Sequence, residues 1–433
     1  MNTLDPTIHN KIDKFQRVAV FGAGVSGQSA RRLAQSLGLE VCLFDEGGKG
    51  DSSEFGEQCL HQFDAFVFSP GFAESHPWRV LVESSSHPCY SEFGFAALYW
   101  RGHLLGVTGT NGKSTITALL QEALVSAGVT AFQAGNNGIP LSDYILSNKN
   151  HRDAYAVCEV SSFQAELTQG LQFEGLIWSN FAEDHLDRYA SMHEYFSAKK
   201  KLLSCLHPNA PVCLGADVPL FEASIMERPN TMVVDKDPSL INTLSPSSPF
   251  FKGPQSINFV LAASLWRALK LPPDILVDAA NKFKLAAHRL SLIDMWGGVI
   301  FLDDSKATNF HAALAAIDTM EHPIYWIGGG SYKGGDIKAF IHAVSRKVEV
   351  GFLYGKMAEQ LSVYYRQTKS KFEAHADFAD AVRGATEGAL SNSPSIVLLS
   401  PGFASFDQFS GYAARGNAFI SAVSNLKDIY CSE

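Results

Sequence analysis

The clearest chemical signal in the chain is the segment Gly109-Thr-Asn-Gly-Lys-Ser114, which combines two glycines with a lysine and a hydroxyl residue. It follows the apolar run His103–Thr108, which predicts a strand, and precedes Ile116–Ala127, which predicts a helix. In such a turn, backbone N–H groups can surround phosphate oxygens, Lys113 can reach the terminal phosphates and Ser114 can meet Mg²⁺. The spacing departs from the usual GxxxxGKS pattern, but the segment predicts a phosphate-binding loop rather than a plain glycine turn.

Two further strand ends carry groups that bind hard metal ions. Glu159 lies near the end of the predicted strand Tyr155–Val160, and Asp184-His185 follows the predicted strand Leu176–Trp178. Oxygen and imidazole ligands suit Mg²⁺ or Mn²⁺ bound to substrate phosphates better than a structural zinc site. A single Glu or His at a strand end is more often an ordinary loop residue, and only the neighbouring phosphate loop favours a metal here.

Three polar loops follow predicted strands in the last third of the chain. They are Asp303–Asn309, Gly328–Asp336 and Ser400–Phe409. Because the carboxyl ends of parallel strands meet at one edge of a sheet, loops in these positions are expected to converge. We interpret them as parts of one ligand site rather than as simple turns.

Two other patterns are open to more than one interpretation. Gly22-x-Gly24-x-x-Gly27 with Asp45 suits a dinucleotide or a nucleotide diphosphate, although three glycines can also serve close strand–helix packing. The run Lys199-Lys-Lys201 is ordinarily a solvated helix face. Only the setting of Lys199 makes it a candidate for chemistry.

Three stretches of alternating strands and helices must position these residues, and alternating order predicts parallel sheets. By contrast, Pro208–Gly253 is rich in Pro, Ser and Asn and predicts irregular edge structure rather than core. Besides the elements already named, the predicted strands are 17–21, 40–44, 65–68, 299–302, 324–327, 350–354 and 395–399, and the predicted helices are 28–37, 193–203, 310–320 and 378–389.

The composition is that of a globular protein. The chain has 433 residues, 46% apolar and 18% charged, which predicts two or three domains, and its net charge of -9 disfavours a nucleic-acid-binding surface. Seven cysteines without a CxxC pair predict reduced thiols. Met1–Gln16 lacks the apolar core of a signal peptide, and no apolar run is long enough to span a bilayer. We expect a cytoplasmic protein without membrane partners.

Taken together, these segments resemble the Mur ligase family, in particular its D-glutamate-adding members, over nearly the whole chain. The motifs that carry the resemblance are TGTNGKST at 108–115, SSFQ at 161–164, EDHLDRY at 183–189, HRL at 288–290, DDSKATN at 303–309 and SPGFASFDQF at 400–409. The resemblance implies ATP-dependent joining of D-glutamate to UDP-N-acetylmuramoyl-L-alanine through an acyl-phosphate, in peptidoglycan precursor synthesis. It also implies an α/β fold of three domains: Rossmann-like for the UDP end (1–99), P-loop ATPase-like for ATP (100–285) and Rossmann-like for the amino acid (286–433).

The resemblance further implies roles for individual residues. ATP contacts are Gly109, Thr110, Asn111, Gly112, Lys113, Ser114, Thr115, Asn258, Arg289 and Asp304, and metal ligands are Ser114, Glu159, His185 and Lys199, the last as a carbamylated lysine. Lys113, His185 and Lys199 are the implied catalytic residues. The UDP-linked substrate is assigned to Ser26, Asp45, Glu46, Gly71 and Asn136, and D-glutamate to Lys306, Thr308, Lys333, Ser405, Phe406 and Tyr412.

Three positions depart from the family pattern. Gln255-Ser-Ile257 precedes Asn258 where His-Asn is usual, Asp303 stands where Asn is usual, and Glu46 replaces a small hydroxyl residue. We expect a monomer that uses ATP and Mg²⁺. The alternatives are a related amide ligase with another amino acid, a dinucleotide-dependent oxidoreductase, which leaves the phosphate loop without a purpose, and an ATP-gated binding module.

Overall fold

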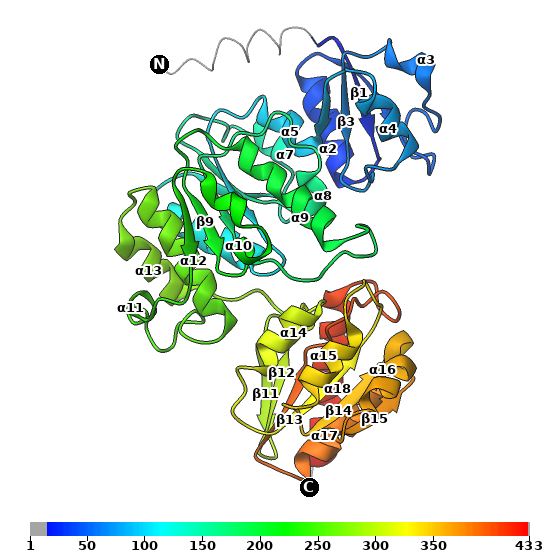
Figure 1. The fold of residues 1–433 in the computed structure, drawn as a ribbon, viewed down its shortest axis with the longest axis vertical. Helices are drawn as coiled ribbons and strands as arrows, with labels where there is room; N and C mark the ends of the chain where they lie inside the picture. Colours follow the sequence, from blue (N-terminus) through cyan, green and yellow to red (C-terminus); the bar gives the residue numbers. More distant parts are fainter. Residues whose placement is uncertain (1–14, 432–433) are drawn as a thin grey trace. The chain divides into compact units, whose positions relative to one another are not determined.

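The computed structural model describes residues 15–431, which form three β-sheets (Figure 1). The first sheet has four parallel strands in the order β2-β1-β3-β4. Its strands are β1 (Arg17–Phe21), β2 (Glu40–Phe44), β3 (Ala65–Phe68) and β4 (Cys89–Ser91), and its helices are α2 (Val25–Ser36), α3 (Glu57–Leu60), α4 (Pro77–Glu83) and α5 (Glu92–Ala97). The core beside it is largely aromatic, and the rings of Phe21 and Phe68 stack with centroids 4.1 Å apart.

The second sheet has six strands, all parallel, in the order β10-β9-β8-β5-β7-β6. The strands are β5 (His103–Thr108), β6 (Ala131–Gly135), β7 (Tyr155–Glu159), β8 (Gly175–Trp178), β9 (Val212–Gly215) and β10 (Thr231–Val234). The helices of this segment are α6 (Lys113–Ser126), α7 (Leu141–Ile145), α8 (Ser162–Ala165), α9 (Met192–Lys200), α10 (Val218–Phe221), α11 (Pro238–Ile241), α12 (Pro254–Ala268) and α13 (Pro273–Lys282), with 3₁₀ turns η1 (Lys201–Cys205) and η2 (Ala223–Glu227).

The third sheet has six strands in the order β11-β12-β16-β13-β14-β15, and only β11 runs antiparallel to its neighbour. The strands are β11 (Ser291–Trp296), β12 (Val299–Asp303), β13 (Ile324–Gly329), β14 (Val350–Tyr354), β15 (Lys371–His375) and β16 (Ser395–Leu399). The helices are α14 (Phe310–Ile317), α15 (Ile337–Val344), α16 (Ala358–Tyr365), α17 (Phe378–Leu390) and α18 (Tyr412–Cys431), with the 3₁₀ turn η3 (Gly355–Met357).

Strand β16 shows why the central strands are continuous apolar runs. Successive side chains of a strand point to opposite faces of its sheet. Ile396 and Leu398 pack into a cluster with α14, α15 and α16, whereas Val397 and Leu399 pack into a second cluster with α17 and α18. Both faces of the strand are therefore buried, as expected for a parallel sheet covered by helices on each side.

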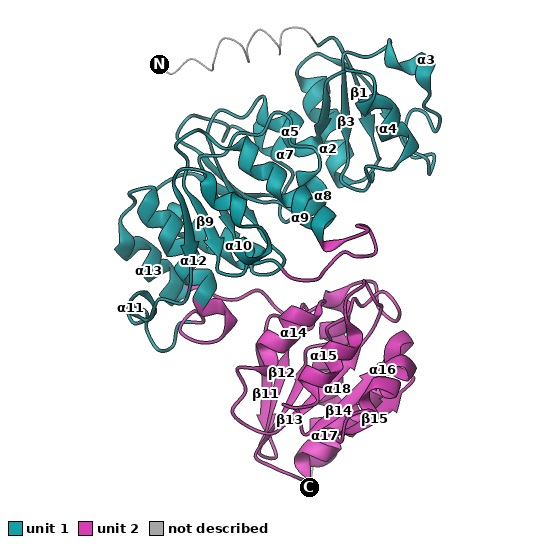
Figure 2. Cartoon of the chain, viewed as in Figure 1, with its two compact units in different colours: residues 1–181, 193–248, 257–282 teal, residues 182–192, 249–256, 283–433 magenta. Residues whose placement is uncertain are grey.

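The described chain separates into two compact units (Figure 2). The first contains residues 1–181, 193–248 and 257–282, and so holds the first and second sheets. The second contains residues 182–192, 249–256 and 283–433, and holds the third sheet. The predicted α/β fold class with parallel sheets is confirmed, while the domain limits at 99 and 285 stay predictions.

Most predicted elements are present, and one prediction is wrong. Strands 17–21, 40–44, 65–68, 350–354 and 395–399 have the predicted limits. Helices α2 and α6 begin at Val25 and Lys113, three residues before the predicted starts. The stretch Pro208–Gly253 does contribute core, because β9 joins the second sheet and all its residues are buried.

None of the described helices is both long enough and apolar enough to cross a membrane. All seven cysteines lie in the described part of the chain, and none of them forms a disulfide.

Candidate active site

The predicted phosphate loop lies between β5 and α6, with Gly112 as the residue that starts the helix. Gly109 and Gly112 have φ angles of +138° and +84°, a region that side-chain-bearing residues avoid. A Cβ atom on Gly109 would also lie 2.0 Å from the hydroxyl oxygen of Ser179. Both glycines are therefore required by the backbone, and the first N–H groups of α6 open toward the loop.

Residues after β8 hold the loop in shape. Asn180 accepts a hydrogen bond from the Asn111 N–H through its side chain (2.8 Å) and one from the Thr110 N–H through its backbone carbonyl (3.1 Å). The Ser179 hydroxyl donates to the Asn111 carbonyl at 2.5 Å. Sequence reasoning missed both residues, whose only signal was a polar pair directly after a buried strand.

Lys113 lies in the first turn of α6 and bends back over the loop. Its ammonium donates hydrogen bonds to the carbonyl oxygens of Gly109 (2.9 Å) and Thr110 (2.8 Å). The positive charge is thus held within the same backbone turn that presents N–H groups, which is the arrangement a phosphate anion requires.

Lys199 on α9 reaches the same loop. Its ammonium donates to the carbonyl oxygen of Gly109 (2.9 Å) and to the Thr108 hydroxyl (3.3 Å), and it lies 5.0 Å from the centre of the Tyr195 ring. Lys199 is 1% exposed, whereas the side chains of Lys200 and Lys201 are 42% and 43% exposed. The interpretation of all three lysines as one solvated face is therefore wrong for Lys199.

Glu159 ends β7, the strand beside β5, and is buried. One carboxylate oxygen accepts a hydrogen bond from the side-chain amide of Asn136 at 2.9 Å. The other oxygen is buried and has no hydrogen-bond partner among the described residues. A buried carboxylate oxygen without a donor is costly unless a cation meets it, so this position fits a divalent metal ion.

Asn258 approaches the phosphate loop from α12. Its side-chain oxygen is so close to Gly112 that a Cβ atom on that glycine would lie 2.4 Å from it. Asn258 is buried, as is Thr115 in the first turn of α6. The structure thus brings Asn258 to the loop despite the unusual residues that precede it.

Four of the residues predicted for the UDP-linked substrate lie in loops or a helix start of the first sheet, whereas Asn136 follows β6 of the second sheet, beside Glu159. Asp45 follows β2 and accepts a hydrogen bond from the Ala23 N–H at 2.8 Å, so it ties the glycine-rich turn after β1 to the end of β2. This bond and a second one from the Lys49 N–H hold the pKa of Asp45 below its usual value. Glu46 lies 3.3 Å from the imidazole of His76. Ser26 is in the first turn of α2, and Gly71 is in the loop after β3.

In the second unit, Asp304 directly follows β12 and is half-buried. Its carboxylate accepts hydrogen bonds from the Ser400 hydroxyl (2.8 Å) and the Leu290 N–H (3.1 Å). Burial raises its pKa to about 7, against the lowering effect of these bonds and of Arg289. The side chain therefore links the predicted HRL and SPGFASFDQF segments.

The segment that carries His185 also belongs to the second unit. His185 has a φ angle of +57° and follows Asp184, which accepts hydrogen bonds from Lys333 (2.8 Å) and Asn309 (3.2 Å). Burial would raise the pKa of Asp184, but the charges of Lys333 and His185 hold it below its usual value. Asp184 is thus a carboxylate that fixes Lys333, and the sequence did not indicate this pair.

The remaining residues predicted for the amino acid lie in the loops after β12 and β16 and at the start of α18. The ammonium of Lys306 lies over the ring of Tyr412, 4.0 Å from its centre. Ser405 is buried, whereas Phe406 is 72% exposed. Thr308 stands between Lys306 and Asn309, which starts α14. These residues lie in loops that the third sheet carries at the ends of β12 and β16.

Arg415 on α18 was missed by the sequence analysis. It is fully buried and donates to the Ser305 hydroxyl (2.9 Å), the Ser305 carbonyl (2.8 Å), the Tyr354 hydroxyl (3.0 Å) and the Phe403 carbonyl (3.1 Å). It therefore joins the loop after β12 to the loop after β16. No local sequence pattern distinguishes it from an exposed helix arginine.

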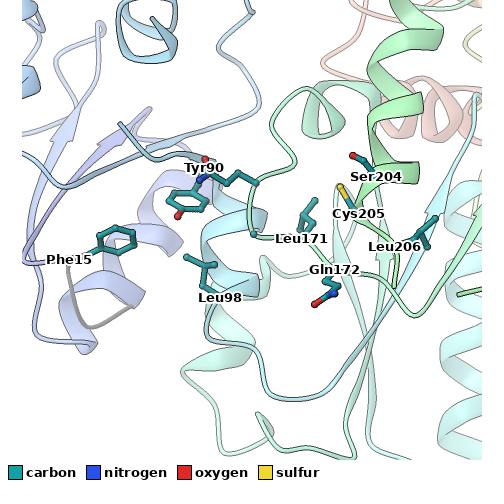
Figure 3. A pocket seen from close by; sticks show the side chains of 10 residues that line it. Phe15, Tyr90, Leu98, Leu171, Gln172, Ser204, Cys205 and Leu206 are labelled. Carbon is teal, nitrogen blue, oxygen red and sulfur yellow. The ribbon is translucent and has the colours of Figure 1, made fainter. Parts of the chain in front are cut away.

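Among residues 15–431, no group of three or more His, Cys, Asp or Glu side chains is arranged to hold a metal by itself. A cavity of about 240 Å³ lies elsewhere in the first unit (Figure 3). Figure 3 shows Tyr90 and Leu98 on one side of it and Leu171, Cys205 and Leu206 on the other. None of the predicted site residues lines this cavity.

A phosphate loop on a parallel sheet, with a buried lysine and a buried carboxylate beside it, defines a nucleotide-binding enzyme of the α/β class. Residues 107–236 match the Mur ligase middle domain. Over 95% of its length the chain is 30% identical to the UDP-N-acetylmuramoylalanine–D-glutamate ligase of Chlorobium luteolum, 98% of which is covered, and 29% identical to that of Lachnospira eligens, 99% of which is covered. The chain belongs to the Mur ligase family, among its UDP-N-acetylmuramoylalanine–D-glutamate ligases.

The fold agrees with solved structures of the family. The UDP-N-acetylmuramate–alanine ligase of Thermotoga maritima superimposes with a TM-score of 0.58 at 15% identity, over 95% of this chain and 100% of that chain. At this identity the likeness concerns the fold alone.

Proposed function

We propose that this protein uses ATP to join D-glutamate to UDP-N-acetylmuramoyl-L-alanine in peptidoglycan precursor synthesis. The observation that carries this proposal is the burial of Lys199 against the carbonyl oxygen of Gly109, because it places a second amine, besides Lys113, at a phosphate loop. An exposed lysine run gives no such arrangement. The family membership specifies the reaction.

The first half-reaction is phosphoryl transfer. An oxygen of the substrate carboxylate attacks the γ-phosphorus of ATP, the bond to the leaving ADP oxygen breaks, and an acyl-phosphate forms. Residues 109–115 bind the phosphates through backbone N–H groups, and the ammonium of Lys113 offsets the negative charge of the transition state. Asn258 contacts the nucleotide from α12, and Arg289 and Asp304 are further nucleotide contacts.

We assign Ser114, Glu159, His185 and Lys199 to the metal ions. The unpartnered oxygen of Glu159 is the observation that fits a cation. Bound Mg²⁺ would neutralise phosphate charge during the transfer. Lys199 fits this role as a carbamate, because the modification converts a repelling ammonium into an anion, whereas the free amine donates to Gly109.

The second half-reaction forms the peptide bond. The amine of D-glutamate attacks the acyl carbon, phosphate leaves and the amine loses a proton. Lys306, Thr308, Lys333, Ser405, Phe406 and Tyr412 are assigned to the amino acid, whose two carboxylates need positive and hydrogen-bonding partners. Asp184 orients Lys333 for this purpose.

The edge of the first sheet is assigned to the UDP-linked substrate. Asp45 is held as a carboxylate by backbone N–H groups, which fixes the turn of Ser26 for approach of a diphosphate. Glu46 and Gly71 belong to the same part of the first sheet, and Asn136, after β6 of the second sheet, completes the assignment. We also propose domain limits of 1–99, 100–285 and 286–433, a monomeric state and a cytoplasmic location.

The test is ATP-dependent phosphate release with UDP-N-acetylmuramoyl-L-alanine and a panel of D- and L-amino acids. Of the amino acids in the panel, only D-glutamate should support phosphate release at a high rate. Release with another amino acid instead would keep the ATP chemistry and refute the assignment of the terminal pocket. No release with any of them would refute the ligase reaction itself.

A further inference from the structure

The turn His288–Leu290 has an unusual backbone. His288 and Leu290 have φ angles of +65° and +50°, and both flank Arg289. Such angles are uncommon for residues with a side chain, and two of them around one residue persist only when the surroundings enforce them. The direction of Arg289 is therefore fixed at a cost in backbone strain.

The end of β12 supplies the enforcing contacts. The imidazole of His288 is hydrogen-bonded to Asp303 at 2.6 Å, and the Leu290 N–H donates to Asp304 at 3.1 Å. The Lys306 N–H donates to the carbonyl oxygen of His288 at 3.0 Å. The strained turn is thus fastened at both ends to the segment that contains Asp304 and Lys306.

The His288–Asp303 pair is the buried part of this arrangement. The side chain of Asp303 is fully buried and that of His288 almost so, and the second oxygen of Asp303 accepts a hydrogen bond from the Ser305 N–H at 2.9 Å. Helix α18 closes the other side, because a Cβ atom on Gly416 would lie 2.1 Å from the His288 ring nitrogen. The bond to Asp303 and the contact with Gly416 therefore hold the His288 ring in one position.

We propose that the buried His288–Asp303 pair positions Arg289 for the nucleotide by enforcing the strained turn, and keeps it in register with the loop that carries Lys306. His288 and Asp303 are positioning residues, since neither is assigned to a substrate. The inference deepens the proposed function and rests on its assignment of Arg289 to ATP. It also gives a purpose to Asp303, which stands where the family pattern has Asn.

The test compares His288→Ala with His288→Asn. Asparagine tolerates a positive φ and carries an amide nitrogen near the place of the imidazole nitrogen, so it should keep both the turn and the bond to Asp303. We expect His288→Ala to raise KM for ATP by about tenfold with KM for the UDP-linked substrate changed less than about twofold, and His288→Asn to stay within about threefold of wild type. Asp303→Asn, which retains an oxygen acceptor, should also stay within about threefold.

Gly416→Ala perturbs the ring from α18 without altering the turn and should raise KM for ATP in the same way. Gly411→Ala is its matched control, because a Cβ atom there meets nothing within 4 Å. A uniform loss of activity in His288→Ala and His288→Asn, or unchanged KM for ATP in both His288→Ala and Gly416→Ala, would overturn the proposal. If His288→Ala fails to fold, KM for ATP in Gly416→Ala tests the proposal instead.

Arg289→Ala separates this inference from the proposed function. A large rise in KM for ATP in Arg289→Ala, together with no rise in His288→Ala or Gly416→Ala, refutes only the positioning role. If Arg289→Ala leaves KM for ATP unchanged, both the assignment of Arg289 to the nucleotide and the positioning role of His288 and Asp303 are refuted.

Discussion

The ammonium of Lys199 donates a hydrogen bond to the carbonyl oxygen of Gly109 at 2.9 Å, so one turn of α9 reaches the phosphate loop that starts α6. The next two lysines in the sequence, Lys200 and Lys201, pair with acidic residues instead of the loop. Lys200 pairs with Glu222, and Lys201 pairs with Glu74 at 2.7 Å. Three lysines in sequence therefore provide one candidate for chemistry and two matched controls.

Lys199→Ala should be nearly inactive, with a loss of at least about a hundredfold in kcat, because it removes the side chain that we propose to be the metal-binding carbamate. Lys200→Ala and Lys201→Ala should stay within a few-fold of wild type, because exposed ion pairs contribute little. Steady-state phosphate release from the three variants checks this. Equal losses in all three would indicate a helix that is needed for folding instead.

A short carboxylic acid separates the carbamate from the plain amine. Acetate supplies an anion of similar size, so it should partly restore the activity of Lys199→Ala while leaving wild type unchanged. Formate and acetate titrations measure the effect, with chloride at equal ionic strength as the control. Absence of rescue together with normal metal dependence in the variant would argue for a role of the free amine.

Lys113→Ala should lower the ligation rate by at least about a hundredfold, since it removes a positive charge from the site that we propose for phosphoryl transfer. The fold should persist, because the two printed bonds of Lys113 go to the carbonyl oxygens of Gly109 and Thr110 within its own loop and do not join separate elements. Thermal unfolding and turnover are measured on the same preparation. Near-normal turnover would show that this loop does not serve the transferred phosphate.

The strands were predictable because parallel strands with two buried faces are continuous apolar runs, as Ala65–Phe68 and Ser395–Leu399 illustrate. Strand β9 was missed because only four residues, Val212–Gly215, form it within a stretch rich in Pro and Asn. The composition of a long segment is dominated by the residues around so short a strand, so it does not predict the strand itself.

The site was predictable where a motif keeps its members adjacent, as in the phosphate loop. It was not predictable where distant residues meet, as Lys333 meets Asp184 at 2.8 Å. The burial of Lys199 could not be predicted either. Successive residues of a helix point to different sides, and only the packing of α9 determines which side is buried. Contacts between residues that are distant in the sequence depend on the fold and were therefore not predicted.

Lys306→Ala and Ser405→Ala should raise KM for D-glutamate by about tenfold or more while leaving KM for ATP nearly unchanged, because both are assigned to the amino-acid pocket. Lys347→Ala is the control for the lysine, since Lys347 lies on the surface of the same unit and pairs with Asp318. Two substrate titrations for each variant make the comparison. A shift in the ATP dependence instead would mean that the roles of the two units are assigned wrongly.

The last prediction concerns Glu92, a buried glutamate of α5 that lies outside the proposed active site. Its carboxyl accepts hydrogen bonds from the hydroxyl (2.6 Å) and the N–H (3.1 Å) of Ser142 in α7. Burial raises its pKa from 4.5 to about 7, although both bonds from Ser142 act in the opposite direction. The folded protein therefore retains a proton on Glu92 over a range of pH in which the unfolded chain has lost it.

The sign of the effect follows from proton counting. Between about pH 4.5 and about pH 7 the folded state binds more protons than the unfolded state at this position, so the free energy of unfolding falls as pH rises through that window. Glu92→Gln removes the titration and keeps an oxygen acceptor for Ser142. Relative to wild type, the variant should therefore gain stability on going from pH 4.5 to pH 8, by up to about 3 kcal/mol. Urea unfolding of both proteins at the two pH values measures this. If the two proteins differ in stability by the same amount at both pH values, burial does not raise the pKa of Glu92 in the folded protein.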